Sequence, residues 1–189
     1  AAVEEVRSLF GTVGPQGLRL LGSRLVGIQR MLQQKGCRVE AVQVAHDAIR
    51  FRSALVGSGD RAALTGLAES LQALATAWAE LARYADATEA AQNAVGARRR
   101  LAIDGGADGV IELAASLCDL GRWRGRAEGD PAHALHILQE ALCLLRPWAS
   151  RGMLEARIES ARIHFAIATF LGDHRRAAEA VRPSGLAVE

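Results

Sequence analysis

The chain has 189 residues, enough for one cooperative domain with a sizeable core, and two independent cores are not expected. Its 23 basic and 21 acidic residues give a formal net charge of +2, so charge alone points neither to nucleic acid nor to an acidic membrane surface. Half of the residues are apolar but only 4% are aromatic, which excludes a disordered chain and favours helices packed through small side chains.

The cysteines and the hydropathy pattern bear on the cellular compartment. Cys37, Cys118 and Cys143 are odd in number and lack metal or redox spacing, which favours buried thiols in a reducing cytosol. No apolar stretch of about 18 residues or signal pattern occurs, so we expect a cytoplasmic protein without a membrane partner. Lys35 is the only lysine, a bias typical of a GC-rich bacterial genome. A start without methionine is compatible with a domain excised from a longer protein.

Apolar residues recur every three or four positions, and the breaks fall at Gly and Pro, which predicts a series of amphipathic helices. We place these helices at residues 2–10, 16–35, 38–56, 61–82, 84–103, 107–127, 131–148, 151–171 and 173–182. Gly36 suits a left-handed helix end, Asp130 and Pro131 a helix start, and Gly172 with Asp173 should close the penultimate helix. The turns are short, so successive helices should be antiparallel neighbours.

The sequence also repeats itself at a fixed spacing. Residues 40–49 match residues 86–95 at an offset of 46, and the same frame returns at Ala134 with one extra residue. Residues 67–71 match residues 113–117 at the same offset of 46. One helix pair cannot bury its apolar face alone, so this period indicates a solenoid of stacked pairs.

The second repeat resembles the tetratricopeptide pattern of small and large residues. The residues that carry the resemblance are Leu71, Leu74, Ala75 and Trp78 on the first helix and Tyr84, Ala87, Ala91 and Ala94 on the second. Small residues let paired helices approach closely, and the large ones fill the space between layers. The resemblance spans roughly residues 16–182, but the spacing of 46 exceeds the family's period of about 34 residues.

This resemblance implies an all-α fold: a right-handed superhelix of antiparallel helix pairs with eight or nine helices. Residues 1–189 would form one domain with repeats at 16–56, 61–103, 107–148 and 151–182. The long period requires longer helices or longer connections than the family usually has. A generic bundle of helical hairpins is the structural alternative.

Residues that could carry catalysis or bind a metal are few and isolated. His133 and His136 are three residues apart, but no third ligand lies nearby, so no metal site is expected. Cys118 occupies a helical position that could face a groove, although free cysteines are more often small buried residues. No nucleophile motif or phosphate loop is present, so we expect neither an enzyme nor a cofactor.

Arginines give the stronger signal. Arg122, Arg124 and Arg126 surround Trp123, and an arginine beside an aromatic ring can bind a carboxylate, a phosphate or a stacked base. The near-neutral charge and the lack of other interleaved aromatic residues argue against nucleic acid.

The family's inward positions, carried over residue by residue, imply a concave groove on the first helices of the repeats. The residues at these positions are Arg30, Gln33, Gln34, Glu69, Gln72, Thr76, Glu80, Cys118, Arg122, Arg126, Glu159 and Arg162. We therefore expect a non-catalytic scaffold that binds a peptide or partner protein in this groove. The alternative is a ligand-sensing or regulatory domain of a larger signalling or transcription-regulator protein. Apolar residues 186–188 also suggest a homodimer.

Overall fold

The computed structural model describes residues 13–56, 61–128 and 131–181, with side chains described as far as residue 173. These residues form helices and no strand, which confirms the all-α fold. The helices are α2 (Pro15–Gln34), α3 (Arg38–Val56), α4 (Arg61–Glu80), α5 (Tyr84–Ala102), α6 (Gly106–Glu128), α7 (Pro131–Ala149) and α8 (Leu154–Val181). None of these described helices is both long and apolar enough to cross a bilayer.

Most helix bounds agree with the expected ones to within a few residues, but the last two expected helices are wrong. Residues 151–171 and 173–182 were expected as separate helices, whereas α8 runs without a break through Gly172 and Asp173. A glycine in a helix interior costs about 1 kcal/mol relative to alanine, which weakens a helix but does not end it. The described part of the chain thus holds seven helices against the expected eight or nine. The expected helix at 2–10 and the cap residue Asp130 lie outside the described residues.

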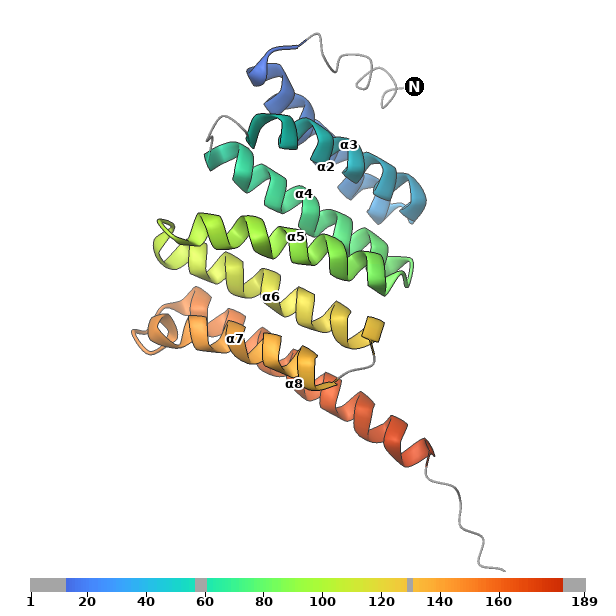
Figure 1. Cartoon of the computed structure of the whole chain (residues 1–189), viewed down its shortest axis with the longest axis vertical. Helices are drawn as coiled ribbons and strands as arrows, with labels where there is room; N and C mark the ends of the chain where they lie inside the picture. Colours follow the sequence, from blue (N-terminus) through green and yellow to red (C-terminus); the bar gives the residue numbers. More distant parts are fainter. Residues whose placement is uncertain (1–12, 57–60, 129–130, 182–189) are drawn as a thin grey trace, which may run out of the picture.

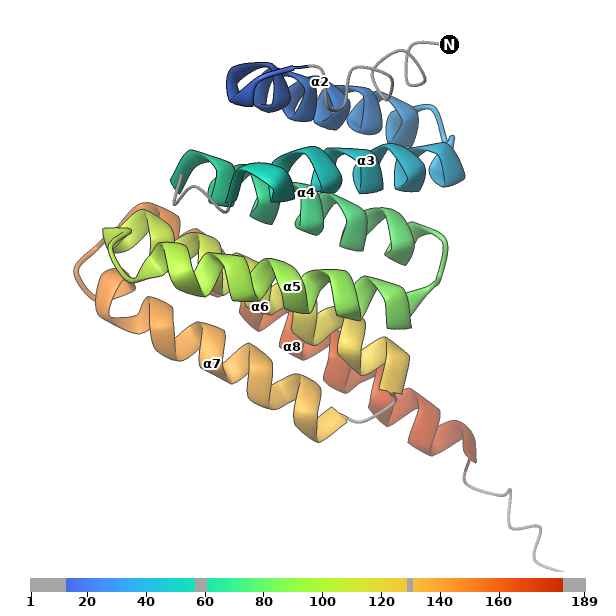
Figure 2. The ribbon, with the colours of Figure 1, turned by 45° about the horizontal axis from the view of Figure 1, so that its top comes forward.

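Consecutive helices pack on one another, so the chain forms an elongated stack with α2 at one end and α8 at the other (Figures 1 and 2). In addition, α2 packs on α4 and α6 packs on α8, whereas no comparable packing joins α4 to α6, α3 to α5 or α5 to α7 within the described residues. We call the even-numbered helices the inner layer, and side-chain hydrogen bonds from Gln72 and Arg162 to Asp119 join α4, α6 and α8. The helices α3, α5 and α7 form an outer layer whose members diverge from one another.

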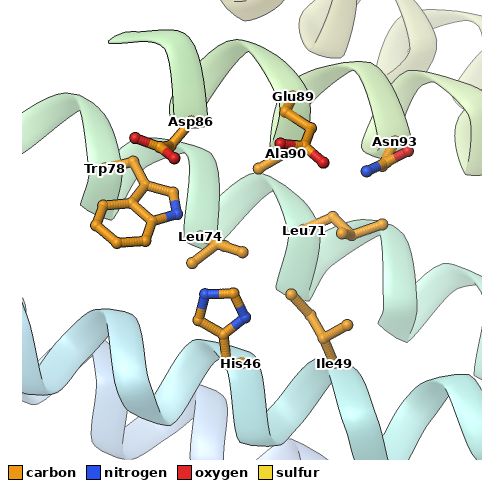
Figure 3. Close-up of a pocket in the computed structure, with 9 residues that line it drawn as sticks. All are labelled: His46, Ile49, Leu71, Leu74, Trp78, Asp86, Glu89, Ala90 and Asn93. Atoms are coloured by element: carbon orange, nitrogen blue, oxygen red, sulfur yellow. The ribbon is translucent and has the colours of Figure 1, made fainter. Parts of the chain in front are cut away.

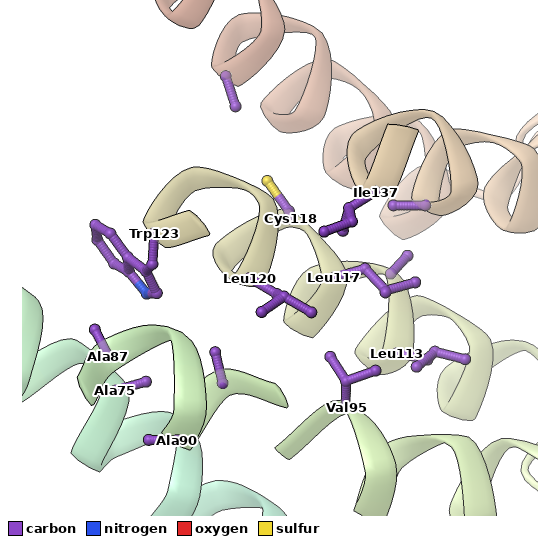
Figure 4. Packing of buried hydrophobic residues seen from close by; sticks show 14 of the residues in the cluster. Ala75, Ala87, Ala90, Val95, Leu113, Leu117, Cys118, Leu120, Trp123 and Ile137 are labelled. Atoms are coloured by element: carbon purple, nitrogen blue, oxygen red, sulfur yellow. The ribbon is translucent and has the colours of Figure 1, made fainter. Parts of the chain in front are cut away.

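The repeat seen in the sequence corresponds to equivalent buried positions in the outer layer. The equivalent residues are Ala41, Ala45 and Ala48 on α3, Ala87, Ala91 and Ala94 on α5, and Ala134, Leu138 and Ala141 on α7, all at most 1% exposed. Each outer helix thus presents small side chains to its neighbours, which allows close packing. The main core continues through α6, where Leu117 and Leu120 lie between Val95 of α5 and Ile137 of α7 (Figure 4).

Three turns between helices use the same helix-ending motif. Gly36, Ala82 and Gly152 have φ angles of 74°, 57° and 85°. At the first turn the backbone N–H of Cys37 donates to the carbonyl of Leu32 over 2.9 Å, and equivalent bonds follow Ala82 and Gly152. This pattern is the Schellman motif, in which the residue with positive φ lets the last carbonyls find donors. Gly36 thus adopts the expected left-handed conformation.

Two arginines at equivalent positions of the repeat are buried between layers. Arg52 at the end of α3 is 7% exposed and donates to the carbonyl of Gly66 and, over 3.1 Å, to the hydroxyl of Ser70 on α4. Arg98, 46 residues later, is 9% exposed and pairs with Glu112 on α6. Each arginine therefore ties an outer helix to the inner helix that follows it.

The last inner helix exposes an apolar stripe. Leu154, Ile158 and Phe165 of α8 are 61%, 60% and 74% exposed. Each earlier inner helix is followed in the chain by an outer helix that packs on it, whereas the described residues provide none after α8. The fourth expected repeat is therefore represented by one helix.

Candidate binding surface on the inner layer

The candidate site is built around Arg162 on α8. Its Nε donates to Oε1 of Glu159 over 2.9 Å, one turn earlier on the same helix. Its Nη1 lies 3.3 Å from Oδ1 of Asp119, and its Nη2 donates to the carbonyl of Ala115 over 3.1 Å. These bonds join α8 to α6 across the inner layer.

Asp119 connects the same cluster to α4. The amide of Gln72 donates to Oδ2 of Asp119, and Nη1 of Arg122 lies 3.5 Å from Oδ1. We call Gln72, Asp119, Arg122, Glu159 and Arg162 the polar network. It places side chains from α4, α6 and α8 in one connected group of hydrogen bonds.

The charges of the polar network are balanced but partly buried. Burial raises the pKa of Asp119 above its ordinary value, although the charges of Arg162 and Arg122 act in the opposite direction. Burial alone would lower the pKa of Arg162, but its hydrogen bond to Glu159 and the charge of Asp119 outweigh that effect and raise the pKa. Arg162 therefore stays charged, and its charge is used within the protein.

Cys118 lies next to the polar network and is fully buried. Burial raises the pKa of its thiol to about 11, although the charge of Arg162 lowers it. The thiolate is the nucleophilic form of cysteine, so this side chain is unreactive at neutral pH. Cys118, expected to face the groove, is therefore not presented to a partner in this structure.

A second group of side chains lies beside the polar network, near the end of α6. The rings of Tyr84 and Trp123 stack with centroids 6.4 Å apart, and the guanidinium of Arg122 lies 4.9 Å from the Trp123 ring. The guanidinium of Arg126 lies 5.7 Å from both rings and has no carboxylate partner among the described residues. Arg122, Arg126 and Phe170 of α8 line a pocket of about 90 Å³. This pocket has room for a side chain.

Three glutamines of the inner layer have buried polar atoms without a partner among the described residues. Gln29 on α2 is 1% exposed, and neither atom of its amide is bonded. The amide nitrogen of Gln33 on α2 and the amide oxygen of Gln72 on α4 also lack a partner. Buried polar atoms of this kind are normally hydrogen-bonded, but these atoms are closed to solvent in this structure, so their side chains would have to move before they met a further group.

The structure brings together only part of the expected groove. Gln72, Arg122, Glu159 and Arg162 meet in the polar network, and Arg126 lies beside Arg122. Of the remaining expected residues, Gln33 is half-buried, and Arg30, Gln34 and Glu80 are exposed.

The last two expected residues, Glu69 and Thr76, bond to other groups of the protein. Glu69 pairs with the buried Arg52 over 3.3 Å, and Thr76 donates its hydroxyl to the carbonyl of Gln72 over 3.1 Å. The Glu69 ion pair therefore joins α4 to α3, and the Thr76 hydrogen bond lies within α4.

Sequence reasoning missed Asp119, which accepts bonds from three helices. A signal was present, because an aspartate three residues before an arginine on a helix can pair with it. His133, considered earlier as a ligand, has its Nδ1 3.7 Å from a carboxylate oxygen of Glu128. Within the described ranges, no group of three or more His, Cys, Asp or Glu side chains could hold a metal ion.

The fold and this surface define an all-helical repeat protein with a cross-linked polar inner layer. Comparison of the sequence with protein-family models found no match, and comparison with curated proteins found none either.

Proposed function

We propose that this chain is a non-catalytic, tetratricopeptide-like scaffold whose inner layer binds a peptide or a segment of a partner protein. The observation that carries the proposal is the exposed guanidinium of Arg126, which lies over the Tyr84 and Trp123 rings without a carboxylate partner among the described residues. Side-chain amides can bond to a peptide backbone, and a guanidinium binds a carboxylate through two parallel hydrogen bonds.

The charges specify which part of the partner is acidic. Asp119 and Glu159 already satisfy Arg162, whereas Arg126 is held over two aromatic rings without a carboxylate partner in the described structure. An acidic side chain of the partner would therefore lie at α6, and its backbone would continue toward α4 and α2.

At the inner layer, pocket size favours one side chain of a longer partner over the free ligand that a ligand-sensing domain of a larger regulator would bind. Drug-sized ligands occupy pockets of about 300–1,000 Å³. The pocket beside Arg122 and Arg126 holds about 90 Å³, which suits one side chain of a longer partner. The protonated thiol of Cys118 likewise offers no nucleophile to a substrate.

The test is selection from a displayed peptide library, followed by affinity measurements on the selected peptides. We expect enrichment of acidic residues and a loss of at least about tenfold in affinity for Arg122→Glu/Arg126→Glu, with binding weakened by salt. Arg157→Glu reverses an exposed charge on α8, five residues from Arg162, and should leave the affinity unchanged. Failure to select any peptide, or equal binding by the double variant, would refute the proposal.

The expected homodimer also remains a proposal. Residues 186–188, on which it was based, lie outside the described residues. The exposed stripe of Leu154, Ile158 and Phe165 on α8 gives a second copy an apolar face to cover. Sedimentation of the chain as a monomer at high concentration would exclude this assembly.

A further inference from the structure

A separate cleft lies between the outer helices α3 and α5, over α4 (Figure 3). Its volume is about 280 Å³, and a neighbouring hollow of about 510 Å³ shares two of its lining residues, His46 and Trp78. We call the two together the outer cleft. The first part has Leu71 and Leu74 of α4 as its floor, with Ile49 of α3 and Glu89 of α5 on facing walls.

One end of the outer cleft already holds a cation of the protein. The guanidinium of Arg83 lies 4.2 Å from the centre of the Trp78 ring, and its Nε donates to Asp86 over 2.7 Å. His46 closes this end by contacting Trp78 edge to face, with ring centroids 6.2 Å apart. An aromatic face next to a carboxylate is a favourable environment for a guanidinium or ammonium group.

The other acidic side chain of the outer cleft is available. Glu89 is exposed and has no ion pair within the described part of the chain, and Figure 3 shows its carboxylate directed over the apolar floor. Asn93, one turn further on α5, adds an amide to the same wall. The outer cleft thus combines an unneutralised negative charge with an apolar floor made by the half-buried Leu71 and the buried Leu74.

We propose that the outer cleft binds a basic peptide segment, with a lysine or arginine side chain extended along Leu71 and Leu74 and its charge paired with Glu89. The neighbouring hollow, lined by Val39 and Leu81, takes an adjacent apolar side chain of the same segment. The lining residues follow α3 from 39 to 49, three helical turns or about 15 Å, the length of four to five extended residues. This length and the two adjoining compartments favour a peptide over a small cation.

The experiment uses the whole chain and two blocked hexapeptides, acetyl-Leu-Arg-Leu-Leu-Arg-Leu-amide and the same peptide with citrulline in place of arginine. Citrulline keeps the shape of the side chain and removes its charge. Calorimetry should show the arginine peptide binding at least about tenfold more tightly, and the NMR signal of the Trp78 indole N–H should shift. Glu89→Gln should reduce the affinity for the arginine peptide to that for the citrulline peptide.

Two variants locate the effect. Glu155→Gln, which removes an exposed carboxylate on α8, should bind the arginine peptide as the wild type does. Arg122→Glu/Arg126→Glu should also bind it normally, so this proposal and the inner-layer proposal can fail independently. Equal affinity for the two peptides, unchanged binding by Glu89→Gln, or no saturable binding up to about 1 mM would overturn the assignment.

Discussion

At the scale of single residues, the inner layer depends on charged groups that the sequence presents as ordinary surface residues. Gln72, Arg122 and Arg162 could be assigned to the inner layer because they occupy inward positions of the repeat. The burial of Arg52 and Arg98 could not be predicted, since arginine is usually solvated and only the packed layers supply its partners. The structure alone shows which polar residues cross-link the helices.

Asp119 makes the stability of the protein depend on pH. Because its folded pKa is raised above the unfolded value of 3.8, the folded state binds more protons between the two pKa values. Its contribution to stability is therefore fully present below pH 3.8 and is lost as pH rises through the folded pKa. Wild type should lose stability relative to Asp119→Asn over this interval, measured by urea unfolding at several pH values. Asp104→Asn, at an exposed site, should show no such trend.

Ala82 is the one non-glycine residue with positive φ in the described structure, and it occupies the turn position equivalent to Gly36. A left-handed conformation costs a residue with a Cβ about 1–2 kcal/mol, and glycine avoids this cost. Glycine is also more flexible in the unfolded chain, which offsets part of the gain in stability. Ala82→Gly should therefore raise the free energy of unfolding by about 0.5–1 kcal/mol, measured by chemical denaturation.

A glycine at an ordinary helical position provides the control for this prediction. Ala161→Gly, at an exposed position in α8, should lower the free energy of unfolding by about 0.5–1 kcal/mol. If both variants were destabilised equally, the turn at Ala82 would carry no conformational strain.

At the scale of helices, Gly and Pro predicted most boundaries because the turns use residues with special backbone conformations. Gly36 ends its helix in the left-handed conformation, and Pro131 stands at the first position of α7. Gly172 shows the limit of this reasoning. A Cβ at Gly172 would meet nothing within 4 Å among the described residues, and the helix continues through this position to Val181. A glycine therefore marks a helix end only where packing also requires one.

The packing of α6 against α7 depends on Gly121. A Cβ at this position would lie 2.9 Å from Cγ of the buried Leu138 and 3.2 Å from the carbonyl oxygen of Ala134. Gly121→Ala should therefore separate the two helices and lower the free energy of unfolding by about 1–2 kcal/mol, measured by urea denaturation.

The matched substitution is Gly96→Ala in the interior of α5, where the added methyl group would meet nothing within 4 Å. Here only helix propensity changes, and the variant should be about 0.5–1 kcal/mol more stable. A stabilised Gly121→Ala would show that α6 and α7 can separate without loss of core contacts.

At the scale of the whole molecule, the stack should be most stable at its centre. The largest core cluster includes residues of every helix from α3 to α8, whereas α2 contributes to a smaller cluster with α3. In stacked repeats each unit is stabilised mainly by its neighbours, so terminal units open more readily. Hydrogen exchange of backbone amides should be slowest in α4, α5 and α6 and faster in α2 and α8. Uniform protection from α2 to α8 would instead indicate a single all-or-none unit.

The order of the stack could be predicted because repeats 46 residues apart place equivalent small residues at equivalent buried positions. The polar network among α4, α6 and α8 could not be predicted, because it joins side chains from different repeats. How closely those side chains approach one another depends on the curvature of the stack. That curvature is set by packing over the entire array.

The three tryptophans give the molecule a separate optical reporter in each of three regions. Trp78 lies in the outer cleft under Arg83, Trp123 lies by the inner layer between Arg122 and Arg126, and Trp148 contacts Arg151 before α8. An approaching carboxylate or cation that displaces one of these arginines changes the surroundings of one indole. Variants that retain a single tryptophan would therefore let fluorescence distinguish occupancy of one face from occupancy of the other.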